Sequence, residues 1–393
     1  MLLVTDSDAF AGTERHILDL AAALSAEGHE AHVGCPDGTP LARRTAAAGL
    51  THRAVSRGTR AGVAALRMAR RHGGYDVLHA HNGRGLLMSA LAAPSRGGPA
   101  LVTTRHFIRL SREGRRGPKR WASAALHGWL NRRLDATIAI SRAVADAAVA
   151  AEPAIRSRLQ QVSNGIASPT PLSPADLGPL GVAGGDTRVL LTVARLEVEK
   201  QVGLVIEAAR RLVDDGGPPF VWLVAGDGAQ RDPLERATRS AFGDRSPLRW
   251  LGRRGDVPAL MTAADVLVHP APDEPFGLVL VEAMAAGRPV VAGRGGAAPE
   301  IIEDRVTGRL FRPGDAASLA ATVADVLASG EDGRRAMGLA GRDRFARYFT
   351  AARMARQTAA VYDQAIRHAG GRSRNRRTHR GGLPGSPSVG LES

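Results

Sequence analysis

The sequence predicts an α/β protein built from two doubly wound domains, and three observations lead to this fold class. Short apolar runs typical of buried strands alternate with helical patterns along the chain, which indicates parallel sheets covered by helices. The 393 residues exceed what one hydrophobic core usually supports. Residues 167–187 form the densest run of Pro, Gly and Ala before the C-terminal tail, so we interpret them as an interdomain linker.

The first predicted domain covers residues 1–166. It opens with the strand LLVT, a loop that passes through Gly12, and an amphipathic helix that Gly28 ends. The segment EAHVGC follows as a second strand, in which we expect Cys35 to pack. Further short strands are expected at YDVLHAH, ALVTTRH, ATIAIS and LQQVSN, separated by helical or basic stretches.

The second predicted domain, residues 188–345, repeats this plan. Its expected strands are RVLLTVARL, FVWLVAGDG, LRWLG, ADVLVHPA, RPVVAG and GRLF, with a helix over VGLVIEAARRLV. Residues 346–368 are predicted to form a C-terminal helix, and residues 369–393 read as a disordered basic tail rich in Gly, Ser, Pro and Arg. Periodicity alone does not distinguish two facing domains from one larger sheet.

Composition limits the class of protein further. A single cysteine excludes an intrachain disulfide and gives no support to a Cys-based metal site. The N-terminal MLLVTDSDAF lacks a basic region and a long apolar run, and no later segment offers about eighteen uninterrupted apolar residues, so we expect a cytoplasmic protein. The formal charge of +15 calls for an anionic partner or a basic appendage.

The most informative segment runs from Glu274 to Val291 and reads EPFGLVLVEAMAAGRPVV. It places two carboxylates, Glu274 and Glu282, on a loop and on the helix that begins near Gly277. The unpaired N–H groups of this helix start suit a diphosphate, so Glu274 would face a sugar and Glu282 a ribose. The alternative is a capping acid followed by a solvated or ion-paired helix residue.

This segment resembles the retaining GT-B glycosyltransferases of family four, also called group 1, whose signature is a Glu, seven residues and a second Glu. The flanking FG, the EAMA segment and the later GRGGAAPEII strengthen the likeness, which spans about residues 1 to 365. The resemblance implies two facing Rossmann-like domains with a cleft between them, and a last helix that returns to the first domain. It also implies that Phe276, Gly277 and Leu278 bind the donor.

The activity that the resemblance implies is transfer of a sugar from a nucleotide-diphosphate sugar to an acceptor hydroxyl, with retention of configuration. No metal or other cofactor is implied. The leaving phosphate itself would take the acceptor proton, because no carboxylate pair flanks the bond as in a glycosidase. Glu274 would then be a ligand of the sugar hydroxyls and would not be the nucleophile.

Sugar transfer leaves negative charge on the departing phosphate, so catalysis needs fixed positive charge there. Arg195 and Lys200, in TVARLEVEK, match an Arg and a Lys that the family places on the diphosphate. The alternative is a pair of solvent-facing cations beside Glu197 and Glu199. One departure is Gln201, where the family usually has Gly after this Lys.

Glycines in strand-to-helix loops are further candidates, because a missing side chain lets the backbone approach a ligand. Gly12 in AFAGTERH would approach a phosphate or sugar, although relatives usually show two glycines and Ala11 precedes it here. Gly226 and Gly228, in a GDG turn, would contact the base or ribose, although a tight turn alone explains both. Supporting positions near the donor are Gly295, Gly296 and Glu300.

Histidines supply the remaining chemical candidates. His106, in LVTTRHF, lies at the predicted carboxyl end of a strand and matches a family histidine beside the transferred sugar; the alternative is a structural histidine. His79 and His81, in LHAHN, are expected to be structural or to face the acceptor. The segment 6–8, DSD, looks like the metal motif of the other glycosyltransferase fold, but its position in a first loop makes us expect no metal there.

Acceptor specificity is expected in the first domain, where a basic segment precedes apolar residues. This mixture suits contact with an anionic membrane surface or with an acidic acceptor, and the alternative is a surface helix that packs its tryptophans inward. The acceptor itself would be lipid-linked, a polysaccharide or a small molecule. The segment's cations are Arg105, Arg109, Arg112, Arg115, Arg116, Lys119 and Arg120, followed by Trp121, Leu126, Trp129 and Leu130.

Three rival functions remain open at this stage. A nucleic-acid-binding protein would explain the charge but not the donor-site residues, so we expect no specific nucleic-acid partner. A GT-B relative that epimerises or hydrolyses nucleotide sugars would share the donor site. A catalytically silent homologue is disfavoured by the presence of Arg195, Lys200, Glu274 and Glu282.

Overall fold

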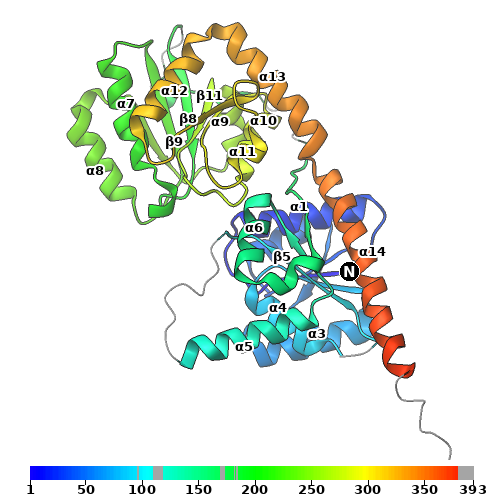
Figure 1. The fold of residues 1–393 in the computed structure, drawn as a ribbon. Helices are drawn as coiled ribbons and strands as arrows, with labels where there is room; N and C mark the ends of the chain where they lie inside the picture. Colours follow the sequence, from blue (N-terminus) through cyan, green and yellow to red (C-terminus); the bar gives the residue numbers. More distant parts are fainter. Residues whose placement is uncertain (95–96, 109–117, 169–172, 181, 183–184, 379–393) are drawn as a thin grey trace, which may run out of the picture.

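A computed structural model describes residues 1–94, 97–108, 118–168, 173–180, 182 and 185–378. The chain folds into two domains, each with its own parallel sheet and its own helices (Figure 1). The predicted α/β fold class of two doubly wound domains is therefore confirmed, and one continuous sheet is excluded. The two sheets lie in separate parts of the molecule.

The N-terminal sheet has seven strands in the order β3-β2-β1-β4-β5-β6-β7, and all its neighbours pair in parallel. Strand β3 lies at the edge and was not predicted, because its sequence THRA is polar and largely exposed and therefore lacks an apolar signal. The other strands match the predicted segments. The bounds are β1 (Leu2–Val4), β2 (His32–Cys35), β3 (Thr51–Ala54), β4 (Val77–Ala80), β5 (Ala100–Arg105), β6 (Ala136–Ala139) and β7 (Leu159–Gln161).

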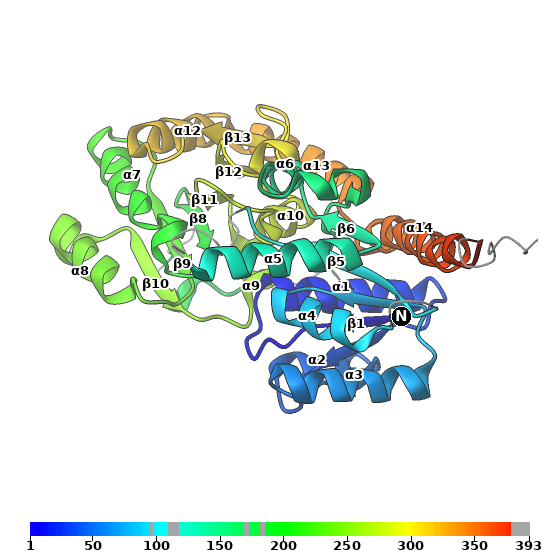
Figure 2. The same ribbon diagram turned by 60° about the horizontal axis from the view of Figure 1, so that its bottom comes forward.

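Helices cover both faces of this sheet (Figure 2). The first helix begins after Ala11, whose N–H donates to Glu14 Oε2 over 2.9 Å, and its last turn leads into Gly28 with a left-handed φ of 87°. Cys35 packs in the buried strand β2, as predicted, and burial raises the pKa of its thiol to about 11. The helices are α1 (Gly12–Ala26), α2 (Pro40–Ala47), α3 (Thr59–Gly73), α4 (Gly83–Ala92), α5 (Pro118–Arg133) and α6 (Arg142–Ala151).

The C-terminal sheet has six parallel strands in the order β10-β9-β8-β11-β12-β13, all of them at predicted segments. The strands are β8 (Arg188–Val193), β9 (Phe220–Ala225), β10 (Leu248–Gly252), β11 (Val266–His269), β12 (Val290–Gly293) and β13 (Gly308–Phe311). The helices are α7 (Gly203–Asp214), α8 (Arg231–Phe242), α9 (Val257–Ala263), α10 (Leu278–Ala285), α11 (Ala298–Ile301), α12 (Ala316–Ala328) and α13 (Gly330–Tyr348).

The end of the chain crosses back to the N-terminal domain. Helix α14 (Ala351–Thr378) contacts α1, β5 and β6, and its Met354, Val361 and Tyr362 belong to the N-terminal core (Figures 1 and 2). The predicted boundary at residue 346 falls inside α13, and the predicted tail start at residue 369 falls inside α14. Residues 379–393 of that tail lie outside the described part.

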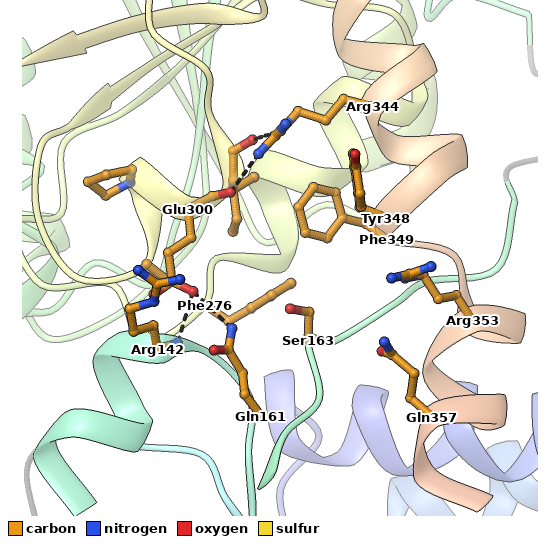
Figure 3. Close-up of a pocket in the computed structure, with 13 residues that line it drawn as sticks. Arg142, Gln161, Ser163, Phe276, Glu300, Arg344, Tyr348, Phe349, Arg353 and Gln357 are labelled. Carbon is orange, nitrogen blue, oxygen red and sulfur yellow. Dashed lines mark hydrogen bonds between the residues drawn. The ribbon is translucent and has the colours of Figure 1, made fainter. Parts of the chain in front are cut away.

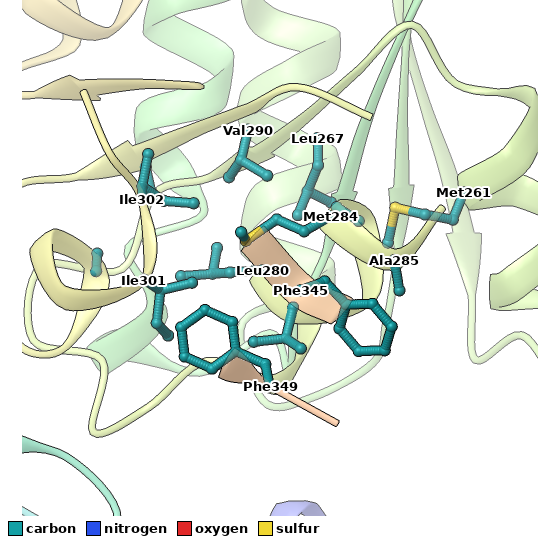
Figure 4. Close-up of a cluster of buried hydrophobic side chains, with 14 of the residues drawn as sticks. Met261, Leu267, Leu280, Met284, Ala285, Val290, Ile301, Ile302, Phe345 and Phe349 are labelled. Carbon is teal, nitrogen blue, oxygen red and sulfur yellow. The ribbon is translucent and has the colours of Figure 1, made fainter. Parts of the chain in front are cut away.

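Helix α10, which carries Glu282, the second Glu of the signature, is fixed by a buried apolar cluster. Leu280 and Met284 are fully buried and pack with Ile301, Phe345 and Phe349 (Figure 4). Burying a large apolar side chain contributes about 1.5 to 3 kcal/mol. The start of α10 is therefore a rigid support for the residues around it.

Among the described residues, no helix is both long enough and apolar enough to cross a lipid bilayer.

Candidate active site

The predicted site residues collect at the carboxyl ends of the strands in both domains. In doubly wound sheets, ligands bind at this edge, where the strand order reverses. The reversal lies between β1 and β4 in one sheet and between β8 and β11 in the other. In the N-terminal domain, Gly12 follows β1 and His106 follows β5. In the C-terminal domain, Arg195 and Lys200 follow β8, and Gly226 and Gly228 follow β9. The loop and helix after β11 carry Glu274, Phe276, Gly277, Leu278 and Glu282.

The start of α1 in one domain faces the start of α10 in the other. A methyl group added at Gly12 would lie 3.9 Å from Leu278 Cδ1, with no nearer neighbour among the described residues. Glu282 interacts electrostatically with Arg15 and Asp19 of α1. The two predicted donor-binding segments thus approach each other across the domain interface.

Lys200, Glu274 and His269 form a partly buried, hydrogen-bonded cluster at this edge. Lys200 Nζ donates to Glu274 Oε2 over 2.7 Å, and His269 Nε2 lies 2.9 Å from the same oxygen. Burial alone would raise the pKa of Glu274, but the hydrogen bond and charge of His269, with those of Lys200, outweigh it and lower that pKa to about 2. Glu274 is therefore an anion at neutral pH, held by two partners from neighbouring strand ends.

His269 was missed by the sequence analysis. It ends strand β11, five residues before Glu274, and its side chain is 3% exposed. The signal was a histidine as the last strand residue in ADVLVHPA, directly before the loop that carries the first Glu of the signature.

Arg195 differs from Lys200 in its surroundings. Its side chain is 60% exposed and pairs with Glu199 over 2.8 Å, whereas the Lys200 side chain is 17% exposed. The solvent-facing alternative thus describes Arg195 as it stands here but does not describe Lys200. Arg195 remains in the β8–α7 loop, at the same edge of the sheet.

Gln201 explains why glycine is usual in the family after this lysine. Its backbone is left-handed, with φ 47° and ψ 37°, and it ends the short 3₁₀ turn Val198–Lys200. A side chain in this conformation costs about 1–2 kcal/mol. Gln201 therefore occupies a backbone conformation that favours glycine, at an energetic cost.

The two glycines of the GDG turn are required by a close backbone approach. A side chain at Gly226 would overlap the carbonyl oxygen of Ala194, and one at Gly228 would overlap that of Leu196. Ala194 and Leu196 flank Arg195, so the turn after β9 packs directly on the loop that carries this cation. The structure thus gives these glycines a packing role.

The loop that presents Glu274 is also held by glycines. Gly277 caps α10 with φ 86°, in the left-handed region that favours glycine. Side chains at Gly295 and Gly296 would overlap the carbonyl oxygens of Pro272 and Glu274. The RGGAAPE segment therefore supports the Glu274 loop from behind.

Glu282 is enclosed between the domains. Burial raises its pKa, Arg15 partly offsets this effect, and Asp19 adds to it. Arg15 itself pairs with Asp19 over 2.8 Å. Of the solvated or ion-paired alternative for Glu282, the solvated form does not fit, whereas the interaction with Arg15 is compatible with the ion-paired form.

His106 belongs to a group of buried histidines at the carboxyl ends of the N-terminal strands. His81 Nδ1 and His106 Nε2 lie 3.3 Å apart, and His16 of α1 stacks edge-on against His106. Burial lowers the pKa of His16 to about 4 and holds those of His81 and His106 well below the usual value, so these rings are neutral at pH 7. His16 was missed, because its helix position gave no sign that it would turn toward the strand ends.

His79 has a structural environment. Its Nδ1 lies 2.7 Å from the Tyr362 hydroxyl of α14, and its Nε2 lies 2.7 Å from Thr104 Oγ1. Its ring also stacks on His81 with 4.1 Å between centroids. Of the two roles expected for His79 and His81, the structural one fits His79.

Glu300 joins the two domains near this site. Its carboxylate accepts the N–H groups of Arg142 and Ala143 at the start of α6, over 2.8 and 2.9 Å. Ser141 Oγ donates across the same interface to the Pro275 carbonyl oxygen over 2.7 Å. A side chain of the C-terminal domain therefore caps a helix of the N-terminal domain.

A pocket of about 530 Å³ lies beside this contact, where the chain crosses between the domains (Figure 3). Phe276 of the predicted donor segment lines it, but Lys200 and Glu274 do not. Arg344, on its wall, donates to the carbonyl oxygens of Glu300 and Ile301 over 2.9 and 2.8 Å. The pocket thus belongs to the domain junction and not to the charged cluster.

The carboxylates of the early DSD segment have protein partners. Asp6 accepts hydrogen bonds from Asn82 and Arg84, each over 2.8 Å, and Asp8 pairs with Arg57 over 2.8 Å. Both acids are engaged by donors or cations of their own domain.

The predicted acceptor segment is only partly described. Arg105 pairs with Glu152 over 2.7 Å, whereas the other six cations and Trp121 have positions or side chains outside the described residues. Trp129 packs on the N-terminal core, Leu130 is buried, and Leu126 is 40% exposed. Trp129 and Leu130 thus follow the inward-packing alternative.

Comparisons with known proteins identify the family of this chain. Residues 10–168 match the family model described as Glycosyltransferase Family 4, and residues 182–344 match that of Glycosyl transferases group 1. The MMP alpha-(1->4)-mannosyltransferase of Mycolicibacterium hassiacum is 32% identical over 76% of this chain and 73% of its own length. The glycogen synthase of Mycobacterium tuberculosis is 30% identical over 91% of this chain and 92% of its own length.

Solved structures show the same fold. Anabaena HepE, in complex with UDP and glucose, has a TM-score of 0.76 and 24% identity over 92% of this chain and 98% of its own. The sucrose-phosphate synthase of Thermosynechococcus elongatus has a TM-score of 0.75 and 19% identity over 93% and 98%. Fold and matched residues define a GT-B glycosyltransferase. The chain belongs to glycosyltransferase family four, group 1, and is an enzyme that transfers glycosyl groups from nucleotide sugars.

Proposed function

We propose that this enzyme moves a sugar from a nucleotide-diphosphate donor to an acceptor hydroxyl with retention of configuration, using the charged edge of its C-terminal sheet. The observation that carries the proposal is the partly buried cluster in which Lys200, after β8, and His269, at the end of β11, both bond to Glu274 in the loop before α10. It offers a cation for a diphosphate and an anion for sugar hydroxyls within one hydrogen-bonded unit.

In this proposal the diphosphate of the donor binds at Lys200 and at the start of α10. An ammonium group has three N–H donors, and Glu274 takes one of them, so others remain for phosphate oxygens. No side chain of the described residues caps α10 at Gly277, so its first N–H groups are also available to an anion. Arg195 would exchange its exposed partner Glu199 for the diphosphate. Together these groups stabilise the charge of the leaving phosphate.

In this proposal the sugar of the donor binds at Glu274. Both of its hydrogen bonds fall on Oε2, which leaves Oε1 to accept from a sugar hydroxyl. Glu282 would bind the ribose, and Phe276, Gly277 and Leu278 would line the donor, with Gly12 facing them from the other domain.

Retention follows from attack on the donor face that the leaving phosphate occupies. The phosphate takes the acceptor proton, while His106 orients the sugar or the incoming hydroxyl from the N-terminal domain. Positive side chains supply the charge stabilisation, so the reaction requires no metal ion. We expect activity to survive extensive chelation by EDTA.

The acceptor would bind on the N-terminal domain, near the histidines and the basic segment 105–120. We propose a carbohydrate, a lipid-linked molecule or an acidic glycan, with the basic segment lying on an anionic membrane surface of the cytoplasm. Binding to anionic liposomes at low salt tests this part, and protein that stays in the unbound fraction would reject it.

The test of the donor site is thermal unfolding in the presence of UDP, GDP, ADP, TDP and their sugars. A ligand at about a hundred times its Kd adds about 2.7 kcal/mol to the native state. We expect one nucleotide to raise the Tm, with the shift lost in Arg195→Ala and Glu282→Ala and kept in the control Arg210→Ala. Arg210 pairs with Asp214 on the surface of α7, so its loss leaves the site intact.

No shift with any nucleotide would reject the proposed donor site. Product analysis by NMR then separates transfer from its closest alternative. Transfer gives an acceptor-bound sugar with the donor's anomeric configuration, whereas free or epimerised sugar in the presence of candidate acceptors would identify a hydrolase or an epimerase.

A further inference from the structure

We infer that His16, His81 and His106 form a binding site for a divalent cation of the zinc class in the N-terminal domain. The three residues come from separate elements: α1, the loop after β4 and the loop after β5. Their side chains converge because the strand ends of a parallel sheet share one edge and α1 starts above it.

The distances suit a metal. One ring nitrogen from each histidine can be chosen so that all three lie within 4.8 Å of one another. The ring centroids are 4.9 Å apart for His16 and His106, 5.3 Å for His16 and His81, and 5.5 Å for His81 and His106. Zinc–nitrogen bonds are about 2.0–2.1 Å long, so the rings would move closer together around an ion, and three protein ligands leave a fourth position open.

The histidines also have unused bonding capacity. Among the described residues, both ring nitrogens of His16 and Nε2 of His81 are buried without a hydrogen-bond partner. Buried polar groups normally find partners, so three such nitrogens in one cluster call for a ligand. The three rings are 3%, 1% and 7% exposed for His16, His81 and His106, so bulk water cannot readily satisfy these nitrogens.

The surroundings contain supporting residues for the ligands. Asn164 interacts with His16 and partly offsets the effect of burial on its pKa, although Asn164 Oδ1 makes no hydrogen bond of ordinary geometry to the described residues. An amide oxygen in this place can accept the second N–H of a metal-bound imidazole. His79, bonded to Tyr362 and Thr104, does not compete for the ion but stacks on His81 and orients its ring.

The site has a consequence for catalysis, and this consequence rests on the proposed function. His106 is assigned there to the sugar, so an ion that takes a nitrogen of His106 excludes that role. Bound zinc would therefore inhibit the transferase, and removal of zinc by EDTA would restore activity. The ion is a competitor of the reaction and not its cofactor.

The test uses the full-length protein without an affinity tag, treated with chelator and then titrated with Zn²⁺ by calorimetry and with Co²⁺ by visible absorption. We expect one ion per chain and the intense bands of four- or five-coordinate Co²⁺. His16→Ala should weaken binding by about 100-fold or more. His32→Gln is the control, because His32 is a buried histidine that bonds to Tyr75 away from the cluster.

The proposal is overturned if the wild-type protein takes up no ion in a one-to-one ratio, or if His16→Ala binds as tightly as wild type. If His16→Ala does not fold by circular dichroism, His106→Asn carries the same comparison, because His106 is the most exposed of the three at 7%. These readouts do not depend on activity, so failure of the proposed transferase reaction would leave the metal result interpretable.

Discussion

The two sheet edges that face each other across the domain interface differ in the charge of their site residues. The C-terminal edge is charged and paired, with Lys200 and His269 both bonded to the Glu274 carboxylate. At the N-terminal edge, the histidines beside β4 and β5 are neutral, because burial keeps them unprotonated. One fold therefore presents a cluster of paired charges on one side and a cluster of uncharged imidazoles on the other.

The difference indicates how the donor is divided between the domains. A diphosphate needs cations and helix N–H groups, which only the C-terminal edge combines among the described site residues. A sugar ring needs groups that accept and donate hydrogen bonds without attracting phosphate, and neutral imidazoles do both. The following variants test whether the two edges divide the donor in this way.

Removing the central cation should have the largest effect. We expect Lys200→Met to lower kcat/KM by at least about 10 to 150-fold, because a charge-assisted hydrogen bond is worth about 1.5–3 kcal/mol. The variant should also melt earlier, since Glu274 keeps only His269 as a partner. Steady-state kinetics measure this, and a loss no larger than that of Arg210→Ala would contradict the assignment.

The anion of the same cluster should show itself in the pH dependence of stability. The pKa of Glu274 falls from an ordinary 4.5 to about 2, so its contribution is present above about pH 4.5 and is lost as the pH falls toward 2. The difference in unfolding free energy between wild type and Glu274→Gln should shrink by about 2 kcal/mol from pH 5 to pH 3. Denaturant unfolding at both pH values measures it.

The matched control for this experiment is Glu207→Gln, an exposed carboxylate on α7. It shows how much the loss of a solvent-exposed carboxylate changes the unfolding free energy at the two pH values. A constant difference for Glu274→Gln would mean that the charged cluster does not stabilise the fold.

The histidines of the N-terminal edge can be tested through helix α14, which packs on the N-terminal domain. Tyr362→Phe removes the hydroxyl that bonds to His79 Nδ1 and should cost about 1–3 kcal/mol, because it leaves a buried nitrogen unpaired. Tyr75→Phe removes a bond to His32 over the same 2.7 Å, away from the site, together with the 3.3 Å bond that Arg53 donates to the same hydroxyl. We expect similar stability losses but a lower kcat/KM in Tyr362→Phe alone. If kcat/KM were equal in both variants, the bond between Tyr362 and His79 would not contribute to catalysis.

The smallest effect concerns the loop that carries Lys200. Gln201→Gly should stabilise the protein by up to about 1 kcal/mol, because relief of the left-handed backbone exceeds the entropic cost of glycine. Arg305→Gly, at the other described non-glycine residue with positive φ, should change stability in the same direction. Thermal melts compare the two, and a destabilised Gln201→Gly would show that the Gln201 side chain contributes contacts.

Much of this arrangement was predictable because it follows from strand order. Apolar runs located twelve of the thirteen strands, and β3 escaped because its edge position removes the need for apolar residues. The approach of Lys200 to Glu274, 74 residues apart in sequence, follows from the adjacency of β8 and β11 in a doubly wound sheet.

The remaining features depend on side-chain packing between elements. No local pattern showed that His16 would turn from α1 toward His106, or that Glu300 would cap a helix of the other domain. The likeness to family four matched Arg195 and Lys200 equally, but the structure separates them by exposure, 60% against 17%. Exposure of this kind arises from tertiary contacts and leaves no signal in a single sequence.

The division between the two edges is tested most directly by calorimetric titration of the nucleoside diphosphate that stabilises the protein best. Wild type, Lys200→Met and His106→Asn would be compared. We predict that Lys200→Met weakens binding by about 10 to 150-fold, while His106→Asn binds the diphosphate like wild type. If His106→Asn weakened binding as much as Lys200→Met, the diphosphate would not be held by the charged edge alone, and the account would be wrong.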